Sequence, residues 1–285
     1  MRRELEPWLA GRVLKRVELL APAGPKYASL ERAAGQSVLS VGRRGKFILA
    51  PLSAGDELVI HLGMTGSISA EEPTGAAAQH VRVRVHLAGK GPETLYFRDA
   101  RRFGRFLVVP AGEYGSLPTL AALGPEPFDD SFSAADFAAR LGRSRTAVKT
   151  YLLSQRPIAG VGNIYADEAL WRARIHPLTS ARDVSRAKAA ELLAAIRAVL
   201  SESIAANGTT IKDYRRVDGE AGGFYERLAV YGKGGQPCPR CGTEMVRTVV
   251  GQRGTVHCPH CQRSPRRRAG PAARRGSERP VRPRT

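Results

Sequence analysis

The most distinctive chemistry in the sequence is carried by four cysteines, which form two Cys-x2-Cys pairs near the C-terminal end. The pairs are Cys238–Cys241 and Cys258–Cys261, and sixteen residues separate them. Thiolate sulfur is a preferred zinc ligand, and this spacing is typical of a site in which two tight turns bring four sulfurs into a tetrahedron. Two disulfides are the alternative, which the charged N-terminal residues disfavour because a secretory signal would be apolar there. The sequence therefore predicts one structural Zn²⁺ ion with no open ligand position.

Positive charge is the second chemical feature of the chain. Its 285 residues carry a formal net charge of +19, which points to a polyanionic partner, with nucleic acid as the first candidate. Residues 264–285 hold eight arginines and one glutamate, a net charge of +7 that leaves +12 on residues 1–263. We expect this proline-rich segment to be a disordered basic tail. Either it adds salt-sensitive affinity for phosphates or it is an inert extension.

Length and composition limit the class of protein. A hydrophobic content of 42% is sufficient for a folded core, and the length suits two domains or one domain with an appendage. No apolar run approaches the roughly 20 residues of a membrane-spanning helix. The sequence therefore predicts a cytoplasmic protein without a membrane partner.

The elements that must position this chemistry differ between the two halves of the chain. Valine alternates with polar residues over 80–87, which predicts a half-buried strand with Arg82 on its polar face. Further short strands are predicted at residues 46–50, 57–61, 94–97 and 105–109, and a helix at 4–10. Together they favour a sandwich of antiparallel sheets.

The pattern becomes helical after residue 127. Ser133 and Asp136 have capping-box spacing, residues 146–155 and 192–204 repeat at helical intervals, and residues 244–250 and 254–257 predict a hairpin. Gly160 and Gly162 form a tight turn between helices, where backbone amides can approach a phosphate. Such a turn is weak evidence alone, because most of them merely connect helices.

Several motifs together make the chain resemble the formamidopyrimidine-DNA glycosylases, which are bacterial base-excision repair enzymes. These motifs are residues 43–47 (RRGKF), 61–66 (HLGMTG), 99–104 (DARRFG), 123–127 (LGPEP), 160–166 (GVGNIYA) and the four cysteines. The resemblance runs from about Arg2 to Gln262. It implies an α+β multidomain fold with an antiparallel β-sandwich domain (1–118), a helix-two-turn-helix domain (119–230), a zinc-finger hairpin (231–263) and the tail (264–285).

The resemblance also implies an activity. Enzymes of this family excise 8-oxoguanine and formamidopyrimidines from double-stranded damaged DNA and cleave the abasic site by β,δ-elimination. The damaged base must leave the stack, which costs a few kcal/mol, so other groups must fill the space that it vacates. The resemblance implies that the protein acts as a monomer.

Site residues follow from the resemblance, position by position. It assigns Met64, Arg101 and Phe103 to the wedge that fills the stack, Lys46 to catalysis beside the abasic sugar, and Arg253 to the lesion phosphate and the second elimination.

The resemblance assigns contacts with DNA to four further residues. Asn163, Lys149 and Arg145 are expected to contact phosphates, and His80 is matched to a DNA-contacting histidine only with a small shift of register.

One part of the family pattern has no counterpart in this sequence. The family's nucleophile is an N-terminal proline followed by a glutamate, whereas this chain begins Met1-Arg2-Arg3-Glu4 and its Pro7 lies too far along. Either Met1 is not the true start, or the chain binds damaged or abasic DNA without cutting it. We favour the first explanation because the other motifs are intact; the coding DNA upstream of Met1 would decide.

A protein of another class would also combine zinc with positive charge. A zinc-ribbon protein that binds RNA or the ribosome shares both features, but neither the wedge residues nor the glycine turn.

Overall fold

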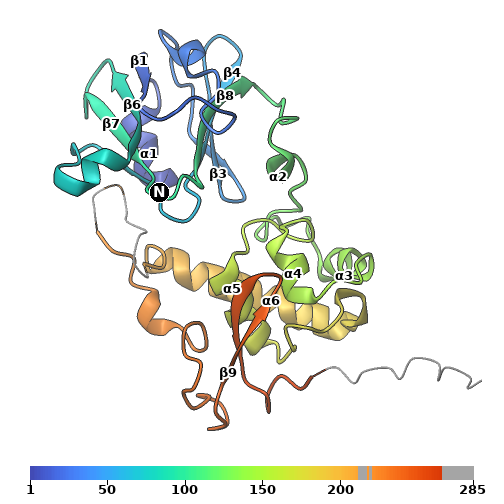
Figure 1. Cartoon of the computed structure of the whole chain (residues 1–285). Coiled ribbons are helices and arrows are strands. Elements are labelled where there is room, and N and C mark those ends of the chain that lie inside the picture. The colour runs from blue at the N-terminus through green and yellow to red at the C-terminus, as the bar shows by residue number, and fades with distance from the viewer. Residues whose placement is uncertain (211–216, 218–219, 265–285) are drawn as a thin grey trace, which may run out of the picture.

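The structure is a computed structural model that describes residues 1–210, 217 and 220–264. The N-terminal half forms one lobe, the helices form a second lobe, and a C-terminal hairpin lies against the helical lobe (Figure 1). The basic tail predicted at 264–285 lies outside the described residues, except for Ser264. Within the described part of the chain, no helix has the length and apolar character needed to cross a membrane.

The N-terminal lobe is a sandwich of antiparallel sheets, as predicted, and each of its two sheets has four strands. In spatial order, the first sheet contains β1 (Leu14–Leu19), β6 (Val81–Leu87), β7 (Thr94–Arg98) and β5 (Ser67–Ser69). The second contains β2 (Gly42–Arg44), β3 (Phe47–Pro51), β4 (Asp56–His61) and β8 (Arg105–Pro110).

Apolar side chains of both sheets meet in one core. Val83 and Phe97 of the first sheet and Ile60 of the second are almost completely buried there. Helix α1 (Arg2–Leu9) contributes Leu5 and Leu9 to the same core. The helix thus anchors the start of the described chain, because truncating a buried leucine to alanine costs about 2–5 kcal/mol.

The alternation predicted for β6 holds for its valines but not for Arg82. This side chain is only 5% exposed, and a register shift separates Val81 from Val83. Its guanidinium donates hydrogen bonds to the carbonyl oxygens of Asp99 (2.8 Å) and Gln79 (3.2 Å). Arg82 is therefore buried because its donors have partners, which period-two patterning cannot reveal.

The outer face of the second sheet is also covered. Phe47, Val59 and Leu107 pack there against Leu117 and Leu120 from the segment that contains α2 (Pro118–Ala121).

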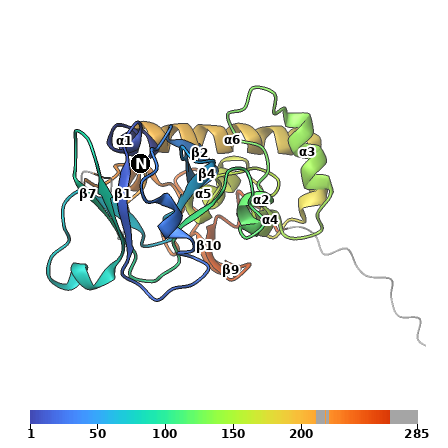
Figure 2. The same cartoon turned by 90° about the horizontal axis from the view of Figure 1, so that it is seen from above.

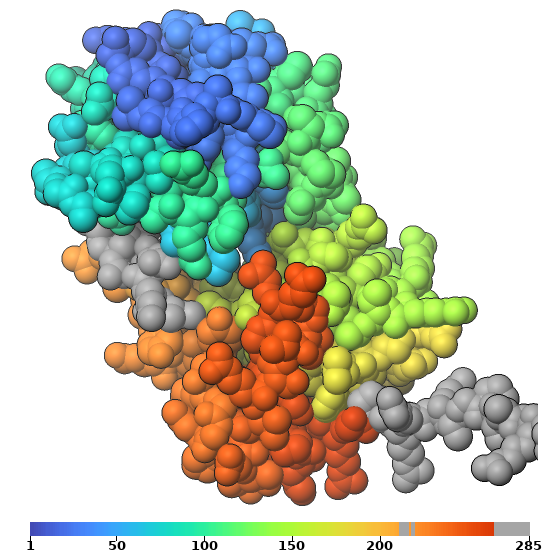
Figure 3. Space-filling model, in the orientation of Figure 1, coloured from blue at the N-terminus to red at the C-terminus, as the bar shows by residue number. Residues whose placement is uncertain are grey.

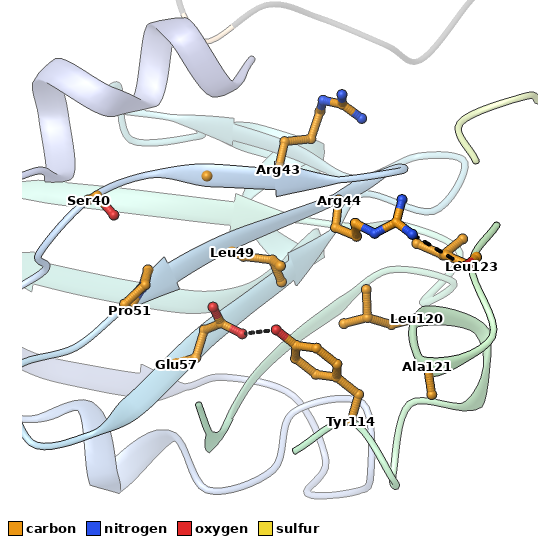
Figure 4. Close-up of a pocket in the computed structure, with 11 residues that line it drawn as sticks. Ser40, Arg43, Arg44, Leu49, Pro51, Glu57, Tyr114, Leu120, Ala121 and Leu123 are labelled. Carbon is orange, nitrogen blue, oxygen red and sulfur yellow. Dashed lines mark hydrogen bonds between the residues drawn. The ribbon is translucent and has the colours of Figure 1, made fainter. Parts of the chain in front are cut away.

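A separate pocket of about 490 Å³ lies beside α2, at the edge of this sheet. In it the Tyr114 hydroxyl donates a 2.7 Å hydrogen bond to the Glu57 carboxylate (Figure 4). Burial and this hydrogen bond raise the pKa of Tyr114 to about 12.

Four helices build the second lobe: α3 (Ala134–Gly142), α4 (Val148–Leu153), α5 (Asn163–Arg172) and α6 (Arg186–Ala205). The predicted capping box is present, since Ser133 and Asp136 each accept a hydrogen bond from the other's backbone amide. Helix α6 is the longest element, and α3 lies against it in Figure 2. The described residues also form four short 3₁₀ helices: Leu30–Ala33, Gly75–His80, Ala181–Asp183 and Tyr225–Arg227.

The C-terminal hairpin pairs β9 (Val246–Val250) with β10 (Arg253–His257), close to the predicted limits. Its tip stands at the mouth of the hollow between the lobes (Figure 3). The hairpin is thus a third wall of that hollow.

Candidate active site and metal centre

A cleft of about 800 Å³ lies between the lobes and is lined by residues of both lobes and of the hairpin. Six of the nine non-metal residues expected from the sequence line it: Lys46, Met64, Arg101, Phe103, Asn163 and Arg253. They come from five segments of the chain. Folding therefore gathers the cations, the wedge candidates and the amide in one place.

Lys46 projects into the cleft from the turn between β2 and β3. Its Nζ donates a 3.3 Å hydrogen bond to the carbonyl oxygen of Val161 in the glycine turn. A Cβ atom at Gly162 would lie only 2.9 Å from this Nζ, so a larger residue there would make the end of the Lys46 side chain shift. Burial, and next the charge of Arg253, lower the pKa of Lys46 to about 8. The amine is therefore partly neutral just above physiological pH.

His61 lies beside Lys46 and was not identified as a site residue from the sequence. Its ring centroid lies 4.6 Å from that of Phe47, and its Nδ1 accepts a 3.1 Å hydrogen bond from the Gly63 amide. Burial, Lys46 and Arg105 lower its pKa to about 4. The imidazole is consequently neutral at physiological pH; its only sequence signal was its place in the 61–66 motif.

Two of the three wedge candidates, Met64 and Phe103, are large apolar side chains exposed within the cleft. Met64 is 48% exposed and Phe103 is 54% exposed. The guanidinium of Arg101 lies 6.0 Å from the centre of the Phe103 ring, and the Lys26 ammonium lies 5.8 Å from it. Such exposure costs free energy in the free protein and indicates a surface that a partner covers.

A buried carboxylate organises the loops that carry the wedge candidates. Asp99 is fully buried and accepts hydrogen bonds from the Gly104 amide (2.6 Å) and the Thr65 hydroxyl. The Thr65 oxygen in turn accepts a 3.1 Å hydrogen bond from the Arg101 amide. Asp99 therefore ties the Met64 loop to the Arg101–Phe103 loop, a role that the sequence analysis did not assign to it.

The hairpin tip joins the two lobes across the cleft. The Arg253 guanidinium lies 3.9 Å from the Met64 sulfur, and the Asn163 amide donates a 3.0 Å hydrogen bond to the Gly254 carbonyl oxygen. The Asn163 Oδ1 atom is buried and has no hydrogen-bond partner among the described residues. Asn163 thus contacts the same hairpin that presents Arg253.

Lys149 is buried and is not among the residues that line the cleft. Its side chain is 0% exposed, and its Nζ lies 2.6 Å from Asp167 and 2.6 Å from the Thr255 hydroxyl. Lys149 occupies an inward position of α4 next to fully buried Val148, and its contact with a phosphate stays a prediction. Desolvation lowers its pKa against the opposing effect of Asp167.

Two other expected DNA contacts lie outside the residues that line the cleft. His80 ends the 3₁₀ helix Gly75–His80, with its Nδ1 3.4 Å from the Arg82 guanidinium. Arg145 is exposed just before α4, and its carbonyl oxygen accepts a 3.3 Å hydrogen bond from the Ser180 hydroxyl. Their contacts with DNA stay predictions.

Glu126 lies in the linker between the two lobes (residues 111–133) and holds the β2–β3 turn that carries Lys46. Its carboxylate accepts hydrogen bonds from the Gly45 amide (2.6 Å), Arg43 (2.7 Å) and Arg44 (3.0 Å). Arg44 also donates to the Leu123 carbonyl oxygen (3.3 Å), the contact drawn in Figure 4. Burial opposes ionisation of Glu126, but these hydrogen bonds prevail and lower its pKa.

The four cysteine sulfurs converge as the sequence predicted. All lie within 4.8 Å of one another, and Cys241 Sγ is 3.5 Å from both Cys258 Sγ and Cys261 Sγ. Tetrahedral zinc with Zn–S bonds of about 2.3 Å needs sulfurs about 3.8 Å apart, so the set fits this ion. The Trp171 indole donates a 3.4 Å hydrogen bond to the Cys238 sulfur, which joins the metal centre to α5.

Comparison with known protein families covers most of the chain. Residues 1–106 match the formamidopyrimidine-DNA glycosylase N-terminal domain, residues 123–215 match its H2TH domain, and residues 235–263 match the zinc finger found in FPG and IleRS. The zinc-finger match and the sulfur geometry together identify the four cysteines as the ligands of a structural zinc ion.

Individual relatives agree with these matches. The formamidopyrimidine-DNA glycosylase of Deinococcus radiodurans is 46% identical over 274 residues, covering 92% of this chain and 94% of the relative. The crystal structure of the Thermus thermophilus MutM (Fpg) protein is 47% identical, with a TM-score of 0.84 over 92% of this chain and 95% of the other.

A Lactococcus lactis Fpg structure, solved in complex with abasic-site DNA, is 30% identical, with a TM-score of 0.80 over 92% of this chain and 97% of that chain. The chain therefore belongs to the formamidopyrimidine-DNA glycosylase family.

Proposed function

We propose that the protein is a bifunctional DNA glycosylase and abasic-site lyase that removes oxidised purines from duplex DNA in base-excision repair. One observation carries this proposal: a single cleft gathers the cations of Lys46, Arg101 and Arg253 with the exposed apolar side chains of Met64 and Phe103. The named activity of the relatives and the abasic-site DNA in the Lactococcus complex support the same conclusion.

The wedge accounts for access to the lesion. A base inside the duplex is out of reach, and extruding it costs a few kcal/mol of lost stacking and pairing. Met64 and Phe103 present apolar surface that replaces the lost stacking, and Arg101 presents a planar cation toward the unpaired base. Asp99 reduces the entropic cost because it orders both loops before DNA arrives.

The cations account for the cleavage of the abasic strand. In β-elimination the C2′ proton passes to water and the C3′–O bond breaks, so that the 3′ phosphate leaves with the bonding electrons. In the second elimination the C4′ proton is lost in the same way, and the C5′–O bond to the 5′ phosphate breaks. Negative charge grows on each leaving phosphate, and fixed cations in a partly dehydrated cleft stabilise it. Arg253 serves the lesion phosphate and the second elimination, while Lys46 acts at the abasic sugar.

The remaining machinery serves binding. Asn163, Arg145 and His80 contact the DNA backbone, and the charge of +12 on residues 1–263 adds affinity that falls with salt. The zinc ion holds the hairpin and performs no chemistry, because protein fills all four ligand positions.

The wider organisation follows from the same proposal. The protein works as a cytoplasmic monomer on double-stranded damaged DNA, with domain limits at 1–118, 119–230, 231–263 and 264–285. The bacterial relatives support the proposed location.

Excision from a defined duplex tests the proposal. The protein produced from the start codon that the coding DNA upstream of Met1 establishes is incubated with an end-labelled duplex that contains one 8-oxoguanine, and with an undamaged duplex as the control. Strand scission at the lesion alone, with phosphate at both new ends, is the expected result. An intact strand combined with lesion-selective binding would instead favour a damaged-DNA binding protein without glycosylase activity. An intact strand with no selectivity would remove the proposal altogether.

A further inference from the structure

We propose that Asp167, through Lys149, is a positioning residue that fixes Arg253 in the cleft. The inference rests on the proposed function, because it assigns Asp167 a part in the handling of the lesion phosphate. Asp167 lies in α5, faces the interior and lines no part of the cleft. It therefore acts only through other residues.

A relay of hydrogen bonds runs from Asp167 to the backbone of Arg253. The Asp167 carboxylate binds the Lys149 ammonium (2.6 Å), which donates to the Thr255 hydroxyl (2.6 Å). That hydroxyl donates in turn to the carbonyl oxygen of Arg253 (3.0 Å). Each link is short, and Asp167, Lys149 and Thr255 are all buried. A displacement at Asp167 is thus transmitted directly to the residue that carries the guanidinium.

Asp167 and Lys149 also bind the backbone of β10 at the residues that follow Arg253. Asp167 accepts a 3.2 Å hydrogen bond from the Val256 amide, and Lys149 donates a 3.1 Å bond to the Gly254 carbonyl oxygen. Asn163 donates to that same oxygen. The three residues after Arg253 are consequently fixed to α4 and α5 at several points, while the hairpin tip beyond them reaches the cleft.

Attachment of the C-terminal segment to the helical lobe does not depend on this pair. The neighbouring Glu168 accepts hydrogen bonds from the backbone amides of Ala229, Val230 and Tyr231, at 2.9–3.0 Å. Trp171 binds the metal centre through Cys238. A buried ion pair is a poor source of stability, because its desolvation offsets much of its attraction. Its value here is the geometry that it imposes on β10.

The test is a double-mutant cycle between Asp167→Asn and Arg253→Ala. The matched control is Glu202→Gln in α6. It removes the carboxylate partner of Arg172, which lies in α5 like Asp167 but does not contact the hairpin through this pair. Affinity is measured for a duplex that contains a tetrahydrofuran abasic-site analogue and for its undamaged counterpart. The ratio of δ- to β-elimination products on a preformed abasic site is the second readout.

Asp167→Asn should weaken abasic-site binding about tenfold, because ångström-scale misplacement of a site group has effects of this size or larger. It should also shift the products toward β-elimination, and Glu202→Gln should do neither. In the Arg253→Ala background, Asp167→Asn should have no further effect on either readout, since the residue through which it acts is gone. Equal losses in both backgrounds, or no loss in either, would overturn the inference.

A second variant covers the case in which Asp167→Asn does not fold. Thr255→Val breaks the relay but leaves the ion pair, so it should shift the product ratio in the same direction while zinc content is unchanged. An unchanged ratio overturns the inference. If the wild-type protein itself does not distinguish abasic from undamaged DNA, the proposed function fails instead, so the two failures are distinguishable.

Discussion

Lys46 shows at the scale of a single residue how the cleft modifies ordinary chemistry. A solvent-exposed lysine is fully charged at neutral pH, whereas burial and Arg253 bring the pKa of Lys46 to about 8. The nearby His61, with a pKa of about 4, contributes no charge at pH 7. The cleft charge near the lesion therefore depends on pH in a range where other lysines do not titrate.

This shift predicts a pH-dependent affinity for abasic-site DNA. About nine-tenths of Lys46 is protonated one pH unit below its pKa and about one-tenth one unit above it, and phosphate binding favours the protonated form. Affinity should therefore fall as pH rises from 7 to 9, and titrations by fluorescence anisotropy at fixed ionic strength measure the fall. The Lys46→Arg variant, which stays charged, should show a flatter profile. Identical profiles would show that Lys46 does not titrate in this range.

At the scale of elements, the β2–β3 turn is the part whose position matters most for Lys46. Glu126 holds this turn through one backbone amide and two guanidinium groups, and Gly45 adopts a φ of 56° there. A Cβ atom at Gly45 would lie 2.9 Å from the Leu123 side chain. The turn and the linker are therefore fitted to each other.

Glu126→Gln should loosen this fit. The variant leaves Arg43 and Arg44 without their carboxylate, and a hydrogen bond to a charged group contributes about 1.5–3 kcal/mol. We expect a lower free energy of unfolding and weaker abasic-site binding, measured by denaturant titration and anisotropy. Glu57→Gln, which removes the partner of Tyr114 outside the cleft, is the control and should leave binding unchanged.

The pH dependence of stability gives the sign of the Glu126 contribution. Its pKa is lowered in the folded protein, so its stabilising effect is fully present above the unfolded value of 4.5 and is lost as pH falls through the folded value. Wild type and Glu126→Gln should thus differ most at neutral pH and converge in acid. A constant difference down to acid pH would contradict this role.

The sequence predicted the elements better than their contacts. Periodicity located five of the eight sandwich strands (β3, β4, β6, β7 and β8) and the long helix, and the capping-box spacing located the start of α3, because these signals are local. Strand β2 has only three residues and no apolar alternation, so it was not predicted as a strand. Short strands of this kind are defined by pairing with distant residues, which no local pattern contains.

For the candidate site too, the sequence predicted positions better than contacts. Motif positions placed Lys46, Met64, Arg101, Phe103, Asn163 and Arg253 in one cleft, but the burial of Lys149 depends on Asp167 and Thr255, which approach it only in the folded chain. Asp99 and Asp167 had no sequence signal beyond an acidic residue in a motif or helix. Buried carboxylates of this kind become recognisable only when their donors are known.

At the scale of the whole molecule, the C-terminal hairpin connects the zinc centre to the cleft. The cysteines hold the base of the hairpin, and Arg253 at its tip reaches Met64 in the opposite lobe. The metal thus lies outside the cleft but determines whether the third wall of the cleft forms.

Removal of zinc should therefore abolish selective binding without unfolding the sandwich. Structural zinc supplies much of the folding free energy of such small units, whereas the two hydrophobic cores of the lobes do not contain it. Chelation should lower abasic-site affinity by at least about tenfold, or roughly 1.4 kcal/mol. Metal analysis and circular dichroism monitor the sample, and added Zn²⁺ should restore binding. Unchanged affinity in metal-free protein would remove the hairpin from the interface.

The central claim is that the cleft between the lobes recognises a damaged site in duplex DNA by replacing an extruded nucleotide. Its most direct test is the affinity of the 285-residue protein for a duplex with one abasic-site analogue, compared with the same duplex without the lesion. Because an abasic site has no base to unstack, we predict affinity at least about tenfold higher for the lesion duplex. We further predict that Phe103→Ala reduces this preference. Equal affinity for the two duplexes would contradict the account.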